Sequence, residues 1–139
     1  MAKTGPIILV EDCIDDQEMV SEALAAISIP NKLVIKNNGA EALEYLRTTE
    51  EKPFLILCDV NMPKMNGLSL RHEINEDARL RRKSIPFVFY STAAVPKDVR
   101  EAYDLTVQGF FVKGATFPEI VDTLKLICDY WASCKHPNS

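Results

Sequence analysis

The feature that most constrains this chain is a fivefold alternation of short apolar runs with segments of helical periodicity. The runs 7–10, 54–58 and 85–90 are apolar throughout, which is typical of strands covered on both faces of a sheet. The run 32–36 carries a lysine at each end, which suits a strand at a sheet edge. A fifth run occupies 109–112. Because strands alternate with helices, the chain is predicted to form a parallel α/β sheet.

The predicted fold is a flavodoxin-like, doubly wound, five-stranded parallel sheet with strand order 2-1-3-4-5 and five helices. A chain of 139 residues fits one domain and can bury roughly 68–70% of its unfolded surface. We therefore expect a single domain over 1–139, with a core at about 6–134 and a short C-terminal tail at 135–139. The basic cluster 79–83 is predicted to lie in a solvated loop.

Charge and hydropathy disfavour several classes of partner. With 16 Lys and Arg against 20 Asp and Glu, the chain has no wide basic field, so we expect no direct contact with nucleic acid. Apolar runs reach only about six residues, far below the roughly 20 that cross a bilayer, and the amino terminus lacks the apolar region of a signal peptide. The four cysteines show no metal-ligand spacing. These observations predict a cytoplasmic protein without membrane contact and with reduced thiols.

Acidic residues follow two of the predicted strands at the point where each strand ends. Glu11 and Asp12 follow the first strand, and Asp59 follows the third. Because the carboxyl ends of parallel strands meet at one edge, we expect these carboxylates to lie close together. At 4 Å each pair would repel by about 1–4 kcal/mol for dielectric constants from 80 down to 20, so the site needs a cation. Mg²⁺ suits it, because this ion favours one or two carboxylates, a carbonyl and an incoming phosphate.

Two further polar residues end the fourth and fifth strands at the same edge. Ser91 follows the fourth strand, and Lys113 follows the fifth. Asp59 is then a candidate nucleophile that would form an aspartyl phosphate. The metal would neutralise phosphoryl oxygens, Lys113 would pair with another, and Ser91 would donate a hydrogen bond to the same group. Asp59 alone could equally begin a turn, and the agreement of several strand ends favours the chemical interpretation.

In combination these residues resemble the receiver domains of two-component response regulators, in particular single-domain members similar to chemotaxis regulators. The resemblance extends from Ile7 to about Trp131. Its motifs are Val10-Glu11-Asp12, Asp59-Val60-Asn61-Met62-Pro63 with Gly67, Ser91 after the fourth strand, and Phe110-Phe111-Val112-Lys113. Residues 76–83 and 129–131 look like single-domain receivers associated with phytochrome-type sensor kinases.

The resemblance implies that Asp59 accepts a phosphoryl group from a histidine kinase or a phosphotransfer protein. Asp12, Asp59 and the backbone carbonyl of Asn61 would bind Mg²⁺ directly, and Glu11 would act through water. Such a phosphoprotein is not an enzyme in the usual sense, because it catalyses only its own phosphorylation and hydrolysis.

The same resemblance implies a conformational switch in signal transduction. Ser91 matches the switch hydroxyl, and Phe110 matches the aromatic residue that turns inward when this hydroxyl moves toward the phosphoryl group. The fourth helix at about 96–105, the strand 109–112 and the last helix from 116 would form the face that changes its preference for a downstream protein partner.

The chain departs from the family pattern at two positions. The family usually has proline after the lysine, often joined by a cis bond, and here Gly114 follows Lys113. A non-proline cis bond costs about 2.5–4 kcal/mol, which favours a trans bond, although the sequence leaves the isomer open. With a trans bond the loop would have a different shape and would hold Lys113 less rigidly. Phe110 replaces the commoner tyrosine, so the packing switch would survive without a phenolic hydroxyl.

The sequence is also compatible with other functions. Gly114 allows a receiver-like module that binds partners without being phosphorylated. A haloacid-dehalogenase-type Mg²⁺ phosphatase also uses an aspartyl nucleophile, but that class has Asp-x-Asp after its first strand and a cap domain. A flavodoxin-like cofactor binder needs a phosphate loop after the first strand, where the acidic segment 11–16 would repel phosphate.

Overall fold

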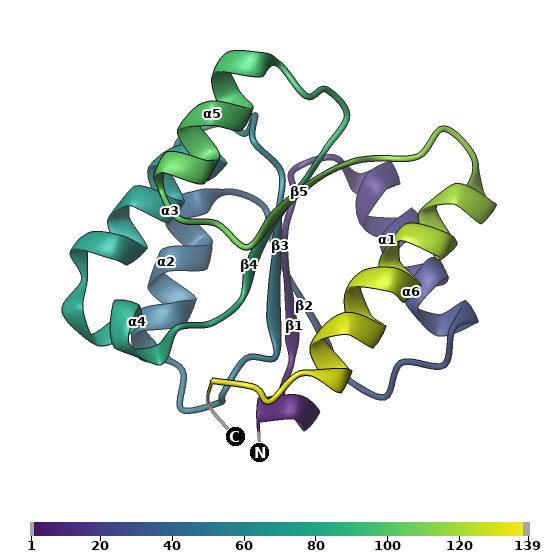
Figure 1. Ribbon diagram of the computed structural model, residues 1–139, viewed down its shortest axis with the longest axis horizontal. Coiled ribbons are helices and arrows are strands. Elements are labelled where there is room, and N and C mark those ends of the chain that lie inside the picture. Colours follow the sequence, from purple (N-terminus) through teal and green to yellow (C-terminus); the bar gives the residue numbers. More distant parts are fainter. Residues whose placement is uncertain (1, 138–139) are drawn as a thin grey trace.

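The structure is a computed structural model that describes residues 2–137, which form a parallel sheet between two layers of helices (Figure 1). The strands are β1 (Ile7–Val10), β2 (Leu33–Lys36), β3 (Leu55–Cys58), β4 (Phe87–Ser91) and β5 (Gly109–Val112). The helices are α1 (Ile14–Ala26), α2 (Gly39–Thr48), α3 (Gly67–Glu76), α4 (Ala78–Lys83), α5 (Pro96–Asp104) and α6 (Phe117–Ser133), and the 3-10 helix η1 (Ala2–Thr4) precedes β1. The strand order β2-β1-β3-β4-β5 confirms the predicted topology.

Each face of the sheet has its own hydrophobic core. Helices α1 and α6 cover one face, whereas α2, α3, α4 and α5 cover the other (Figure 1). Side chains alternate between the two faces along a strand, so a central strand contributes to both cores. In β1, Ile8 and Val10 pack with residues of α2 and α3, and Ile7 and Leu9 pack with residues of α1 and α6. Burial on both faces explains why such strands have continuous apolar sequences.

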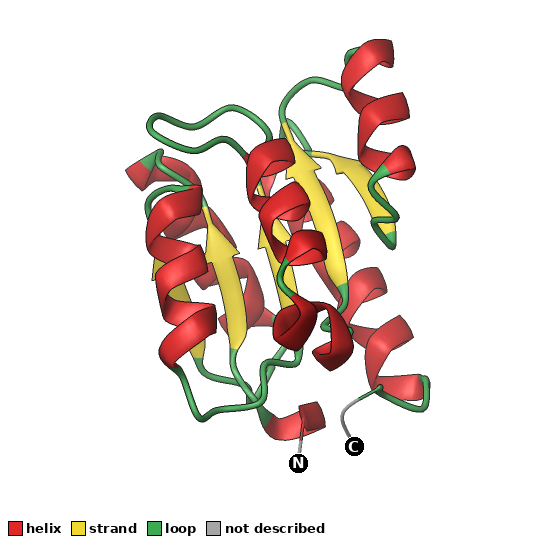
Figure 2. Ribbon diagram, turned by 90° about the vertical axis from the view of Figure 1, so that its left-hand side faces the viewer, coloured by secondary structure: helices red, strands yellow, loops and turns green. Residues whose placement is uncertain are grey.

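The sheet brings the predicted site residues to one edge. All the strands run in one direction, and the 3-10 helix η1 lies at the edge opposite the arrowheads (Figure 2). Val10 is in register with Cys58, so the residues that follow β1 and β3 are neighbours. Ser91 is in register with Val112, so the end of β4 lies beside the end of β5.

The prediction for the basic cluster 79–83 is wrong, because this segment belongs to helix α4 and not to a solvated loop. The described residues therefore form six α-helices where five were predicted. Asp77 caps α4, since its Oδ1 accepts hydrogen bonds from the amides of Arg79 and Leu80, both at 3.1 Å. Leu80 is buried in the core, whereas Arg79 is exposed. One apolar side chain thus anchors a helix that is too short and too charged to show hydrophobic periodicity.

Smaller differences from the prediction occur at the ends of elements. Strand β4 begins two residues later than predicted and includes Ser91. In the predicted tail, His136 is buried, with its Nε2 2.8 Å from the carbonyl oxygen of Phe54 and its ring centroid 5.7 Å from that of Phe54. The last two residues of that tail, 138–139, lie outside the described residues. None of the helices in the described part of the chain is long and apolar enough to cross a membrane.

Candidate functional site

The three predicted carboxylates lie together at the carboxyl edge of the sheet. Glu11, Asp12 and Asp59 each offer an oxygen, and these oxygens all lie within 4.8 Å of one another. Glu11 is 2% exposed, the Asp59 side chain is 12% exposed, and Asp12 is open to solvent. The amide of Asp59 donates a hydrogen bond to the carbonyl of Val10 at 2.9 Å, which fixes the two strand ends against each other.

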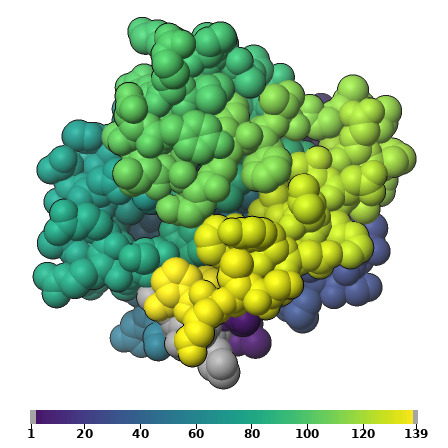
Figure 3. Space-filling model, viewed as in Figure 1, coloured from purple at the N-terminus to yellow at the C-terminus, as the bar shows by residue number. Residues whose placement is uncertain are grey.

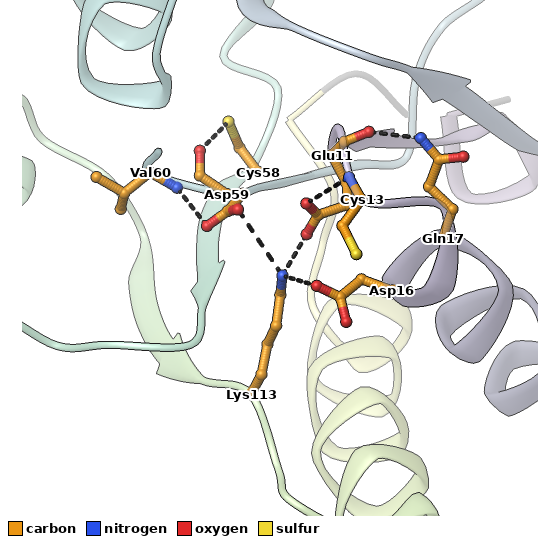
Figure 4. A network of polar contacts seen from close by, with 8 residues as sticks. All are labelled: Glu11, Cys13, Asp16, Gln17, Cys58, Asp59, Val60 and Lys113. Carbon is orange, nitrogen blue, oxygen red and sulfur yellow. Dashed lines mark hydrogen bonds and ion pairs between the residues drawn. The ribbon is translucent and has the colours of Figure 1, made fainter. Parts of the chain in front are cut away.

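Lys113 extends its side chain from the end of β5 into this cluster (Figure 4). Its Nζ makes a short ion pair with Glu11, lies 3.0 Å from Oδ2 of Asp16 and lies 3.8 Å from Oδ2 of Asp59. The Lys113 side chain is only 8% exposed. Its amide donates to the carbonyl of Ser91 at 2.7 Å, which continues the pairing of β5 with β4 past the strand end.

The charges at this site strongly perturb one another. The pKa of Glu11 is raised from 4.5 to about 7, chiefly because the carboxyl is buried. The hydrogen bond from Lys113 opposes this rise, and the charge of Asp59 adds to it. Burial lowers the pKa of Lys113, but its bonds to Glu11 and Asp16 outweigh that effect, so the net pKa is raised. One ammonium therefore compensates several carboxylates, and the site keeps an excess of negative charge.

The donor set fits a hard divalent cation. Mg²⁺ prefers carboxylate oxygens together with water as ligands. The cluster offers carboxylate oxygens that lie close together, and Asp12 is exposed to solvent. Asn61, the predicted carbonyl ligand, lies exposed in the loop between β3 and α3, two residues after Asp59. Its contact with a metal stays a prediction.

The backbone around Asp59 is held in place from several sides. The amide of Val60 donates to Oδ1 of Asp59 at 2.8 Å, and the thiol of Cys58 donates to the Asp59 carbonyl at 3.1 Å (Figure 4). The amide of Gly67, the first residue of α3, donates to the Val60 carbonyl at 2.9 Å. A Cβ at Gly67 would lie 2.2 Å from the Asp59 carbonyl oxygen, so only glycine permits this approach.

Ser91 and Phe110, the two predicted switch residues, lie in the neighbouring strands β4 and β5. Ser91 is buried as the last residue of β4, next to the β3 strand that carries Asp59 at its end, whereas the neighbouring Thr92 is exposed. Phe110 is half-buried, with its ring centroid 5.6 Å from that of Phe89. The packing against Phe89 directs this aromatic ring toward the core. Movement of either residue stays a prediction.

Asp16 is the site residue that sequence reasoning missed. It lies in the first turn of α1, four residues after Asp12, and bonds to Lys113. The acidic segment 11–16 indicates only that phosphate would be repelled after β1. The helical phase that turns Asp16 toward the sheet becomes visible once α1 is known to begin at Ile14. The bond between Lys113 and Gly114, whose isomer the sequence left open, is trans.

Fold and site together define a doubly wound α/β protein with a lysine-bridged acidic centre. The sequence model of the response regulator receiver domain matches residues 7–125. Response regulator Rcp1 of Synechocystis sp. is 32% identical over 130 residues, which cover 90% of this chain and 87% of Rcp1. The crystal structure of the phosphorylated cyanobacterial phytochrome response regulator RcpA has a TM-score of 0.83 and 36% identity, over 92% of this chain and 94% of that one. The Mn²⁺-bound form of Rcp1 has a TM-score of 0.78 and 31% identity, over 91% and 94% of the two chains.

The chain belongs to the response regulator receiver domains, the signalling domains of two-component systems. This membership agrees with the predicted resemblance and with the order of the strands. It also decides against the haloacid-dehalogenase-type phosphatase and the flavodoxin-like cofactor binder, because the family model spans the sheet from β1 through β5 and into α6.

Proposed function

We propose that this protein is a phosphoacceptor switch in which Asp59 takes a phosphoryl group from a histidine kinase or a phosphotransfer protein. The observation that carries the proposal is the position of the Asp59 carboxylate, which is partly exposed at the carboxyl edge, beside two other carboxylates and 3.8 Å from the ammonium of Lys113. RcpA, which has been solved in phosphorylated form, has the same fold over nearly the whole chain.

Glu11, Asp12, Asp59 and the carbonyl of Asn61 are the proposed Mg²⁺ ligands, with Glu11 acting through water. Support comes from the grouped carboxylate oxygens and from the Mn²⁺-bound structure of the relative Rcp1. When bound, the ion would neutralise charge on the phosphoryl oxygens during transfer. The proposed site accounts for a negative excess that Lys113 alone does not compensate.

The protein's own residues would position the reacting groups. An oxygen of Asp59 attacks the phosphorus of the donor, a phosphorus–oxygen bond forms, and the donor's phosphorus–nitrogen bond breaks with its electron pair returning to the histidine ring. The Val60 amide orients the Asp59 carboxylate during this step. Lys113 then pairs with a phosphoryl oxygen, and the Ser91 hydroxyl donates to another.

The proposed output face consists of α5, β5 and α6, which lie side by side on the surface in Figure 3. Seven large apolar side chains are exposed among the described residues, and five of them lie on these elements or at the N-cap of α5: Val95, Tyr103, Val112, Leu126 and Tyr130. Exposed apolar side chains gathered on adjoining elements are typical of a protein-binding surface. A phosphoryl group at Asp59 would bias this face through Ser91 and Phe110 toward a downstream protein.

We further propose that residues 1–139 act as one receiver domain in the cytoplasm, where kinases of two-component systems act. A partner kinase of the phytochrome type is proposed from the likeness to the phytochrome response regulator RcpA.

Intact mass measurement after incubation with Mg²⁺ and acetyl phosphate tests the acceptor. The wild type should gain one phosphoryl group, and the Asp59→Asn protein should gain none. A gain in the Asp59→Asn protein would show that another residue is the acceptor. No gain in either protein, with Mg²⁺ binding measured separately, would favour a module that binds partners without phosphorylation.

The role of Lys113 is tested by separating phosphoryl uptake from the conformational change. The Lys113→Ala protein should take up the phosphoryl group about 100-fold more slowly, because one stabilising cation is lost. Phosphorylation of this variant should leave the NMR resonances of the backbone amides in α5 unchanged. A normal shift of α5 resonances in this variant would disprove the coupling role.

A further inference from the structure

The loop between β5 and α6 is packed against the first turn of α6. A Cβ at Gly114 would lie 2.5 Å from the Cβ of Glu119 and 3.2 Å from its carbonyl carbon. Gly114 does not have a positive φ angle, so the glycine is explained by space and not by backbone conformation. Neither alanine nor the proline that is usual in the family fits here unless the loop moves away from α6.

Glu119 also ties this loop by hydrogen bonds. Its Oε2 accepts from the amide of Ala115 at 2.9 Å, and its own amide donates to Oγ1 of Thr116 at 3.4 Å. On the other side of the loop, the amide of Lys113 donates to the Ser91 carbonyl at 2.7 Å. The main chain is thus held immediately before and immediately after Gly114.

The position of the main chain around Gly114 determines where the ammonium group of Lys113 lies. Lysine has a flexible four-carbon stem, and its ammonium is placed only as well as its backbone and its partners allow. Glycine after the lysine would by itself loosen the backbone, since glycine has the largest conformational freedom of any residue. The contacts of Glu119 remove that freedom and leave the ammonium between Glu11 and Asp16.

We infer that Glu119 is a positioning residue for Lys113, and that the Gly114–Glu119 contact takes over the restraint that proline gives other family members. The inference rests on the proposed function, because Lys113 acts on the phosphoryl group of Asp59. It also links the phosphorylation site directly to α6, an element of the proposed output face.

The test compares initial rates of phosphoryl gain from acetyl phosphate with Mg²⁺ present. Glu119→Ala should lower the rate about tenfold, which is less than the roughly 100-fold that a misplacement of about 1 Å can cost. Glu119→Gln should keep most of the rate, because the amide oxygen of glutamine still accepts from Ala115. In a Lys113→Ala background, Glu119→Ala should lower the rate no further, since the two residues act as one unit.

Glu41 offers a matched control. It is the third residue after the N-cap of α2, as Glu119 is in α6, and its Oε1 accepts from the amide of Asn37 at 3.2 Å. Glu41→Ala removes the same kind of helix-end contact and should leave the rate of phosphoryl gain near that of the wild type.

A second measurement does not depend on phosphorylation. Acetylation of Lys113 by an N-hydroxysuccinimide ester, followed by peptide mass spectrometry, should be faster in Glu119→Ala than in the wild type or Glu41→Ala. Unchanged acetylation of Lys113, or an equal loss of rate with and without Lys113, would overturn the inference. If the wild type gains no phosphoryl group, the proposed function fails, and the acetylation comparison alone decides the role of Glu119.

Discussion

Lys113 and Arg71 are cations that the fold largely buries in opposite surroundings. The side chain of Lys113 is 8% exposed, and Arg71 is buried. Arg71 donates to the backbone carbonyls of Leu105 and Thr106, both at 3.0 Å, and its guanidinium carbon lies 5.3 Å from the ring centroid of Phe87. Lys113 instead meets three carboxylates. The buried Arg71 holds parts of the fold together. The buried Lys113 places a positive charge beside Asp59, the proposed phosphoacceptor.

The partners explain this difference. Neutral carbonyls satisfy the hydrogen bonds of Arg71 without balancing its charge, and burial lowers its pKa. Carboxylates around Lys113 raise its pKa in spite of burial and leave a local excess of negative charge. A buried cation whose hydrogen bonds are satisfied by neutral carbonyls stabilises the fold. A buried cation that is surrounded by an excess of carboxylates can respond to an arriving metal ion or phosphoryl group.

Removing the ammonium of Lys113 should have the largest effect on stability. In EDTA, Lys113→Ala leaves Glu11 and its neighbours without a countercharge, so the free energy of unfolding should fall by about 3 kcal/mol. Urea denaturation measures this loss. Adding Mg²⁺ should restore part of it, because the ion supplies positive charge at the same edge. A loss that Mg²⁺ does not reduce would contradict the charge imbalance.

The pH dependence of stability should report Glu11. Its pKa is about 7 in the folded protein against 4.5 when unperturbed, so the folded state binds more protons than the unfolded state between these values. In EDTA, this contribution to stability is present below about pH 4.5 and is lost as pH rises through 7, by an amount on the order of 3 kcal/mol. Urea denaturation of the wild type and of Glu11→Gln across this range isolates the effect, and parallel curves would disprove it.

Arg71 should behave as a purely structural cation. Arg71→Met removes the donors to Leu105 and Thr106, and the free energy of unfolding should fall by about 2 kcal/mol. The rate of phosphoryl gain should stay that of the wild type. Arg82→Met, at an exposed position of α4, is the matched control and should change neither quantity. A slower phosphoryl gain in Arg71→Met would remove the distinction between the two cations.

The sequence allowed prediction of the Lys113 site but not of the Arg71 site, for a physical reason. The end of an apolar run in the sequence marks the end of a strand. Because the carboxyl ends of parallel strands lie at one edge of the sheet, the sequence alone groups Glu11, Asp59 and Lys113. Arg71 meets carbonyls that lie 34 and 35 residues away along the chain. Every residue has a backbone carbonyl, so the pattern of side chains in a sequence does not show which carbonyls will bind an arginine.

The same reasoning explains the other misses. Helix α4 depends on the cap at Asp77 and on the burial of Leu80, and neither shows as a periodicity in a short segment whose charged residues are all basic. Asp16 depends on the first residue of α1, and helix boundaries are the least certain feature of a pattern. Gly114 was identified as a departure from the family, but the neighbour that explains it, Glu119, is defined only by tertiary packing.

The smallest expected effect also tests the charge imbalance most directly. In EDTA, Asp59→Asn should raise the free energy of unfolding by about 1 kcal/mol, because it removes a charge that repels Glu11 across a few ångströms. With Mg²⁺ at about 100 times its Kd, the wild type should gain about 2.7 kcal/mol and become the more stable protein, since the variant has lost a ligand. Asp122→Asn, at an exposed position of α6, should show neither change. If Asp59→Asn is less stable than the wild type even in EDTA, the attraction of Asp59 to Lys113 outweighs its repulsion by Glu11, and the site is balanced without a metal.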